Sequence, residues 1–162
     1  MAWISFEDHK KYPNLANFVL QTVPQTVDEP KIWGAMCVAA FSVFGNSRVE
    51  AGLAMKNGNP PRITWKLYSD PTFYAEYEHL TKCIYLNEDF VARFEKTPEN
   101  QAARQFVKAT VLHEMVHHLD FLDGSFQDYD LVGVKKIPKE GVEERGHAFE
   151  RMAFGRTLSG SW

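Results

Sequence analysis

The 162-residue chain has no long uninterrupted hydrophobic run, although 44% of its residues are hydrophobic. No segment approaches the roughly 18 consecutive apolar residues that a membrane-spanning helix needs, so stable membrane insertion is not expected. Residues 1–8 also lack the basic start and apolar core of a secretory signal peptide. We therefore expect a protein that acts in the cytoplasm, or that leaves the cell by another route or as part of a larger protein.

Cysteine is scarce and positive charge is not in excess. The two cysteines, Cys37 and Cys83, show neither the spacing of a metal site nor that of a redox motif. We expect two buried thiols, with a disulfide between them as the alternative. The formal net charge is −3 and no stripe of Lys and Arg alternates with aromatic residues, which disfavours nucleic-acid binding.

A chain of this length suits a single domain spanning residues 1–162, with an N-terminal lobe (1–96) and a helical part (97–155). Thr97 and Pro98 have the residue types of a helix N-cap and first helical position, and Asn87 that of a cap for a shorter helix. Hydrophobic periodicity and turn residues predict the remaining elements. Helices are expected over 12–23, 28–44, 97–123 and 140–155, and strands over 62–68 and 80–86.

The long predicted helix carries the sequence His113-Glu114-Met-Val-His117. Positions i and i+4 lie one turn apart on the same helix face, so His113 and His117 can both bind one zinc ion through a ring nitrogen. Glu114 lies about 100° around the helix, close enough to act on a metal-bound water. This spacing indicates the metal-binding half of a zinc peptidase.

A catalytic zinc site needs a third protein ligand and an open position for water. The predicted helix over 140–155 would present Glu143, His147 and Glu150 on one face, because they are spaced by four and three residues. Glu150 is the expected third ligand, since small Ala153 one turn later permits close helix packing. His147 and Glu143 are the alternatives, and a residue that is not a ligand would orient one.

A second hypothesis takes the third ligand from the motif's own helix. Asp123 lies six residues after His117, the spacing of the metzincin pattern, but Asp120 occupies the position where that pattern requires a glycine. Asp120 is more consistent with a hydrogen bond to a ligand histidine one turn away. His118 points off the ligand face and is expected to be structural.

The chemistry follows from these parts. Zinc lowers the pKa of a bound water towards ~7, and Glu114 would take its proton and pass it to the leaving amine. Residues 82–86 are expected to form an edge strand, to which an extended substrate would add through main-chain hydrogen bonds. The residue that stabilises the oxyanion stays open among four candidates: Tyr68, Tyr85, Tyr129 and His147.

The sequence resembles zincin metallopeptidases with a glutamate ligand, and more narrowly the toxin peptidase domains of polymorphic toxins and type VI secretion effectors. The resemblance rests on residues 111–124, supported by 144–150 and 154–155. It implies an α+β fold in which a small twisted sheet packs on the central motif-bearing helix, with further helices. It also implies one zinc ion, cleavage of a protein in a target cell after injection, and a cognate immunity protein.

The leading hypothesis is thus a zinc-dependent endopeptidase that acts as a bacterial toxin. The alternative is a non-catalytic, zincin-like binding module that recognises a protein partner. Glu114 argues against this alternative, because a module without catalysis needs no base there. A purely structural zinc site would close the fourth position with Cys or His, and neither cysteine is near the motif in sequence.

Overall fold

The structure is a computed structural model that describes residues 3–40, 52, 61–123, 129–132 and 135–158, with the backbone alone for 123, 129–132 and 135–138. Helices and strands alternate irregularly along the chain. Their order is β1 (Trp3–Ile4), α1 (Phe6–Lys11), α2 (Pro13–Thr22), the 3₁₀ helix η1 (Pro24–Asp28), α3 (Pro30–Ala40), β2 (Arg62–Lys66), β3 (Ala75–Glu78), β4 (Cys83–Asn87), α5 (Glu88–Lys96), α6 (Gln101–Asp123), β5 (Tyr129–Val132), β6 (Lys135–Pro138) and α7 (Arg145–Phe154).

The main sheet has four strands in the order β1-β2-β4-β3. Strands β1, β2 and β4 run parallel, whereas β3 is antiparallel to β4, with Tyr77 opposite Ile84. The prediction that residues 82–86 form an edge strand is therefore wrong, because the strand found there, β4, is paired on both sides. The two edge strands of this sheet are β1 and β3, and the sequence pattern did not predict β3.

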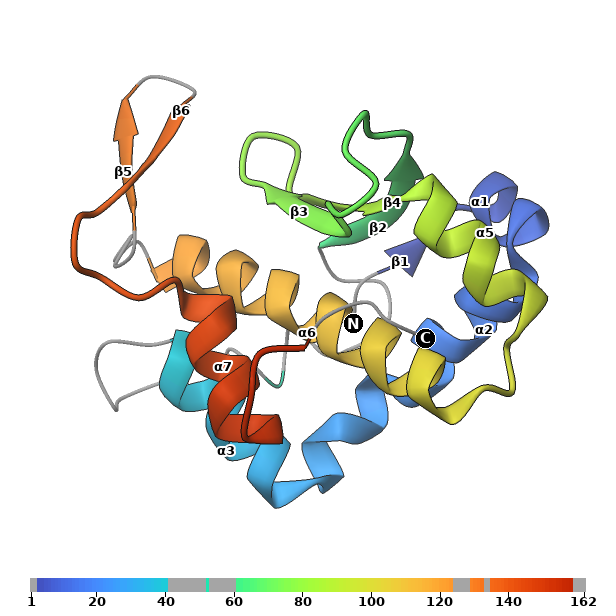
Figure 1. The fold of residues 1–162 in the computed structure, drawn as a ribbon, viewed down its shortest axis with the longest axis horizontal. Coiled ribbons are helices and arrows are strands. Elements are labelled where there is room, and N and C mark those ends of the chain that lie inside the picture. The colour runs from blue at the N-terminus through green and yellow to red at the C-terminus, as the bar shows by residue number, and fades with distance from the viewer. Residues whose placement is uncertain (1–2, 41–51, 53–60, 124–128, 133–134, 159–162) are drawn as a thin grey trace.

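Helix α6 crosses the middle of the molecule, with the sheet on one side and α3 and α7 on the other (Figure 1). It is buried on several faces, as its apolar composition predicted. Eight of its residues are fully inaccessible: Ala103, Val107, Val111, Leu112, Met115, Val116, Leu119 and Asp120. The helix is consequently a rigid support for the histidines of the motif.

Two helices begin later than the sequence predicted. Helix α6 begins at Gln101 rather than near Thr97, because the Asn100 side chain accepts hydrogen bonds from the backbone N–H groups of the first turn. Helix α7 begins at Arg145 rather than at residue 140, because Gly141 has a φ of 72°, a left-handed conformation that ends helical geometry. The predicted end of α3 near residue 45 lies outside the described residues.

Strand β3 is attached to α6 through a buried polar contact. The Nδ1 atom of His118 and the hydroxyl of Tyr77 form a hydrogen bond of 3.1 Å, and His118 is only 1% exposed. His118 thus faces the sheet, which confirms its predicted place off the ligand face. The contact fixes the edge strand relative to the helix that carries the motif.

The molecule is a mixed α and β structure with six α-helices and a small four-stranded sheet among the described residues, compatible with the expected α+β class. Asn87 caps α5 as predicted, accepting a hydrogen bond from the backbone N–H of Asp89. Cys37 and Cys83 are both buried and form no disulfide, in agreement with the expected buried thiols. Within the described part of the chain, no helix is long and apolar enough to cross a membrane.

Candidate metal centre

His113 and His117 lie on the same face of α6, with ring centroids 5.3 Å apart. Their side chains are 16% and 12% exposed, so each ring is buried except along one edge. The Nε2 atoms of both rings approach the carboxylate of Glu144, at 3.3 Å from His113 and 2.5 Å from His117. The two imidazoles therefore lie on one face of α6 and contact the same carboxylate through different oxygens.

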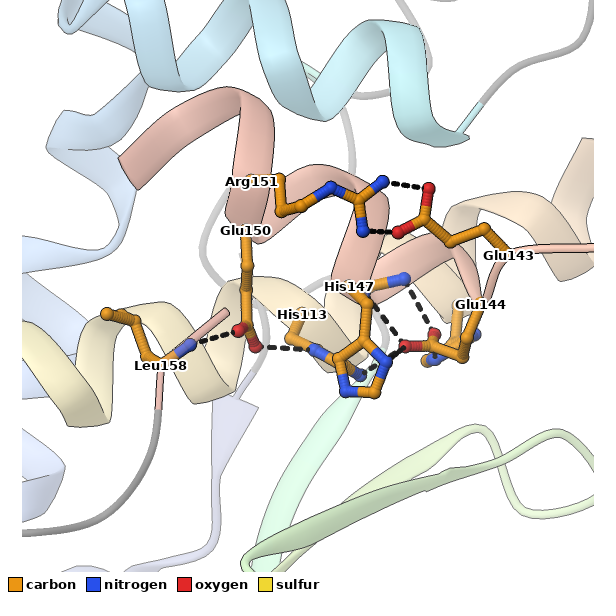
Figure 2. Close-up of polar contacts among 9 residues, drawn as sticks. His113, Glu143, Glu144, His147, Glu150, Arg151 and Leu158 are labelled. Atoms are coloured by element: carbon orange, nitrogen blue, oxygen red, sulfur yellow. Dashed lines mark hydrogen bonds and ion pairs between the residues drawn. The ribbon is translucent and has the colours of Figure 1, made fainter. Parts of the chain in front are cut away.

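Glu144 is held in this position by the start of α7. It is the N-cap residue of the helix, and its carboxylate accepts hydrogen bonds from the backbone N–H groups of Gly146 and His147, at 2.6 and 2.8 Å. The positive end of the helix dipole also favours a carboxylate here. A single side chain thus caps the start of α7 and contacts His113, as Figure 2 shows, and His117.

The charges around Glu144 shift the pKa of its carboxyl group. Burial alone would raise the pKa of Glu144, but the hydrogen bond from His117 and the positive charges of His113 and His117 hold it well below its usual range. The group is consequently an ionised carboxylate at neutral pH. An anionic oxygen ligand beside two imidazole nitrogens is a donor set typical of zinc sites.

Glu150, the expected third ligand, contacts the opposite side of the His113 ring. Its Oε1 atom accepts a hydrogen bond from His113 Nδ1 at 2.7 Å, and its Oε2 atom accepts one from the backbone N–H of Leu158 at 2.6 Å (Figure 2). Burial alone would lower the pKa of His113, but the bond to Glu150 and nearby carboxylates raise it to about 9. The contact leaves His113 Nε2 directed at Glu144.

The two alternative ligands on α7 differ in position. The Nδ1 atom of His147 lies 3.2 Å from Glu144, and its exposed ring lies edge-to-face with that of His113. Donor atoms of His113, Glu144 and His147 all lie within 4.8 Å of one another. Glu143 precedes the helix and forms an ion pair with Arg151. The prediction that it shares a helix face with His147 and Glu150 is therefore wrong.

The remaining candidates from the sequence lie elsewhere. The side chains of Asp123 and Tyr129 are outside the described residues. Asp120 is fully buried within α6. Burial, together with a hydrogen bond to Glu76, raises the pKa of Tyr68, which therefore stays a neutral phenol.

A cleft of about 890 Å³ lies beside the histidines. Strand β3 and the turns that flank it form one wall, and α6 with the start of α7 forms the other. Glu114 is 7% exposed and lines this cleft together with both histidines of the motif. Of the described oxyanion candidates, His147 also lines the cleft, whereas Tyr68 and Tyr85 are not among its lining residues.

Close contact between α6 and α7 depends on Gly146. A Cβ atom added to this residue would lie 2.2–2.4 Å from three atoms of the His113 ring. Distances that short are not tolerated, so any side chain here would displace either the imidazole or the helix. Although glycine is unfavourable inside a helix, Gly146 is thus required for the histidine and the second helix to meet.

We expect Gly146→Ala to destabilise the fold by about 1–3 kcal/mol and to weaken metal binding, because it forces apart a packed contact. Gly34→Ala is the matched control: Gly34 lies inside α3, and an added Cβ would contact nothing within 4 Å. That control should stabilise the protein by about 0.5–1 kcal/mol. Thermal unfolding of both variants tests the contact, and equal shifts in Tm would contradict it.

Sequence reasoning overlooked Glu144 as a site residue. In a helix beginning at residue 140, Glu144 would lie about 100° around the helix from Glu143 and well away from Glu150, so the predicted helix did not indicate it as a ligand. Gly141, three residues before it, was the available signal, because a glycine there permits the left-handed turn after which a new helix starts. Glutamate is also an uncommon N-cap residue, so its type gave no further indication.

When the sequence is compared with known proteins, it matches the model of one protein family. No curated protein and no solved structure matches the chain significantly. A family model described as metallopeptidase toxin 3 matches residues 8–155, which include both walls of the cleft and every residue of the histidine and glutamate cluster. The family is that of a toxin with a metal-dependent peptidase activity, in agreement with the resemblance found in the sequence. The chain belongs to the metallopeptidase toxin 3 family.

Proposed function

We propose that the protein is a zinc-dependent endopeptidase with a zincin-like arrangement of its catalytic residues. The observation that carries the proposal is the convergence of His113 Nε2 and His117 Nε2 on a single carboxylate beside a cleft that also contains Glu114. A zinc peptidase needs metal ligands, a general base and space for a polypeptide, and this site offers candidates for each.

The donor set fits a zinc ion. Two ligands at about 2.0–2.1 Å from zinc in a tetrahedral arrangement are about 3.3 Å apart. The distance between His113 Nε2 and Glu144 Oε2 is 3.3 Å, which matches this value. His117 Nε2 lies 2.5 Å from Glu144 Oε1, a hydrogen-bond contact that would have to widen around a zinc ion. We therefore propose His113, His117 and Glu144 as the ligands of one zinc ion, with His147 close enough to bind or to assist.

Glu150 stays a predicted ligand, but its contacts favour a supporting role. A carboxylate that accepts from Nδ1 of a ligand histidine fixes the ring's tautomer and orientation and raises the basicity of Nε2. The second oxygen of Glu150 is bound to the backbone of Leu158, so both oxygens already have partners. We propose that Glu150 orients His113 for metal binding.

A bound zinc ion supplies a Lewis acid that lowers the pKa of a coordinated water towards ~7 and polarises a carbonyl group. Glu114 is the residue that moves protons: its carboxylate takes one from the attacking water and delivers it to the leaving amine. Its burial in the cleft keeps the carboxylate out of bulk water, where a proton would be lost to solvent.

The substrate is proposed to be an extended polypeptide lying along β3. This strand is one of the two edge strands of the sheet and forms one wall of the cleft. Main-chain groups on the open side of an edge strand can pair with an added strand. The hydrogen bond between Tyr77 and His118 holds β3 at a fixed height above the motif, so the added strand would have a defined position.

Membership of a toxin family supports a target protein in another cell, reached by injection or another secretion route. We propose in addition that an immunity protein protects the producing cell by blocking the cleft. Both proposals rest on the family and on the sequence resemblance, and neither depends on the assignment of the third ligand.

The activity is tested with the zinc-loaded chain and an unfolded protein substrate. We expect cleavage that a chelator removes and that one equivalent of zinc restores, because the catalytic water needs the metal. Cleavage products identified by mass spectrometry distinguish an endopeptidase from an exopeptidase. Cleavage that persists unchanged after complete removal of metal would contradict the proposal.

A further inference from the structure

The side chains of β3 divide between two environments. Tyr77 points towards α6, where it contacts His118 and Phe121. Because successive residues of a strand point to opposite faces, Glu76 and Glu78 lie on the face of the sheet directed away from α6. Glu76 forms an ion pair with Lys66 of β2, which agrees with this placement.

The cleft has a strongly one-sided charge. The described residues that line it include no lysine and no arginine. They include five glutamates: Glu76, Glu78, Glu114, Glu144 and Glu150. A cleft lined by charges of one sign concentrates the electrostatic field and attracts groups of the opposite sign.

Most of these carboxylates already have a positive or ligand-binding partner. Glu76 is paired with Lys66, Glu150 with His113, and Glu144 with both histidines of the motif. Two glutamates have no ion pair within the described part of the chain: Glu114, the proposed base, and Glu78. Glu78 accepts a hydrogen bond of 2.7 Å from the hydroxyl of Thr81. Its negative charge therefore remains uncompensated at the edge of the cleft.

A second group at the same end of β3 also lacks a partner. His79 lines the cleft and is only 8% exposed, and its Nδ1 atom has no hydrogen-bond partner among the described residues. A buried polar atom without a partner costs about 1–3 kcal/mol, and a ligand group that reaches it removes that cost. His79 packs against Phe121 of α6, so its unpartnered nitrogen offers a further polar contact to a ligand on the α6 side of the cleft.

We propose that the cleft selects polypeptide segments with a lysine or arginine close to the cleaved bond, and that Glu78 is the specificity-determining residue. The inference rests on the proposed endopeptidase function and deepens it. A substrate strand beside β3 places alternate side chains next to Glu76 and Glu78, where opposite charges across strands attract and like charges repel. Lysine and arginine fit this position, whereas aspartate and glutamate are rejected.

The test uses a peptide library made from a digested proteome, incubated with the zinc-loaded protein and read by mass spectrometry. We expect Lys and Arg to be enriched over Asp and Glu by about fivefold or more at one position near the cleaved bond. Glu78→Gln should reduce this ratio towards one. Glu99→Gln is the matched control, because Glu99 is 93% exposed and is not a cleft residue, and it should leave the ratio unchanged.

The outcomes separate the two proposals. Cleavage without any preference for basic residues would overturn the inference and leave the endopeptidase function intact. An unchanged preference in Glu78→Gln would overturn the assignment to Glu78. The complete absence of cleavage by the zinc-loaded parent would overturn both the function and the inference.

Discussion

Replacing Glu114 with glutamine is expected to reduce peptide hydrolysis by a factor of about 10² to 10⁴, the usual contribution of a general base. Glutamine has nearly the same size and shape as glutamate but cannot accept a proton at neutral pH. The side chain is 7% exposed and lines the cleft, so the isosteric change preserves packing. The loss of activity should therefore come from lost proton transfer alone.

Three measurements isolate this effect. Zinc content and Tm of Glu114→Gln should match those of the parent, because the residue is not a proposed ligand. Glu99→Gln serves again as the matched surface control and should retain full activity, since its side chain is almost entirely in solvent. A Glu114→Gln protein as active as the parent would exclude the residue as the base.

The second large effect separates Glu144 from Glu150. We expect Glu144→Ala to weaken zinc binding by more than about 100-fold, because it removes a proposed ligand. Glu150→Ala should weaken it by about 10- to 100-fold, the range for a group that orients a ligand histidine. The reason for the difference is geometric: Glu144 faces the Nε2 atoms, whereas Glu150 contacts Nδ1 of His113.

Zinc affinity measured by competition with a chromophoric chelator gives both values. Because Glu144 also caps α7, Glu144→Asn supplies a variant that keeps an N-cap side chain while removing the anionic ligand. A larger loss of affinity in Glu150→Ala than in Glu144→Asn would reverse the two roles and restore Glu150 as the third ligand.

The part of the site on α6 could be predicted because its geometry is local. The spacing of His113 and His117 fixes their relative position once the segment is helical, and the apolar residues around them indicate burial. In the structure their Nε2 atoms both contact the carboxylate of Glu144, each on a different oxygen, and their role as metal ligands stays a prediction. The only requirement beyond the segment itself was a helix, and its composition strongly favours one.

The contribution of α7 could not be predicted in detail, because it depends on where that helix begins. Its start is set by the left-handed conformation of Gly141 and the capping bonds of Glu144. A shift of a few residues in a helix start changes which side chains face a neighbour. The close approach of Gly146 to His113 is likewise a tertiary contact that periodicity does not reveal.

Strand β3 was missed for a related reason. Its sequence, Ala75-Glu-Tyr-Glu78, contains alanine and glutamate, which are depleted in strands, and only Tyr77 has a high β-propensity. The strand forms because β4 offers an antiparallel partner and because Tyr77 is anchored to His118, 41 positions away in the sequence. Pairing of this kind is decided by the tertiary fold.

The proposed binding of one zinc ion by the cluster on α6 and α7 is tested by elemental analysis of the purified chain. The parent should contain one zinc per chain after reconstitution, and His117→Ala should contain essentially none. A parent without zinc, or a His117→Ala variant that retains the metal in full, would contradict the claim and reduce the motif to helix packing.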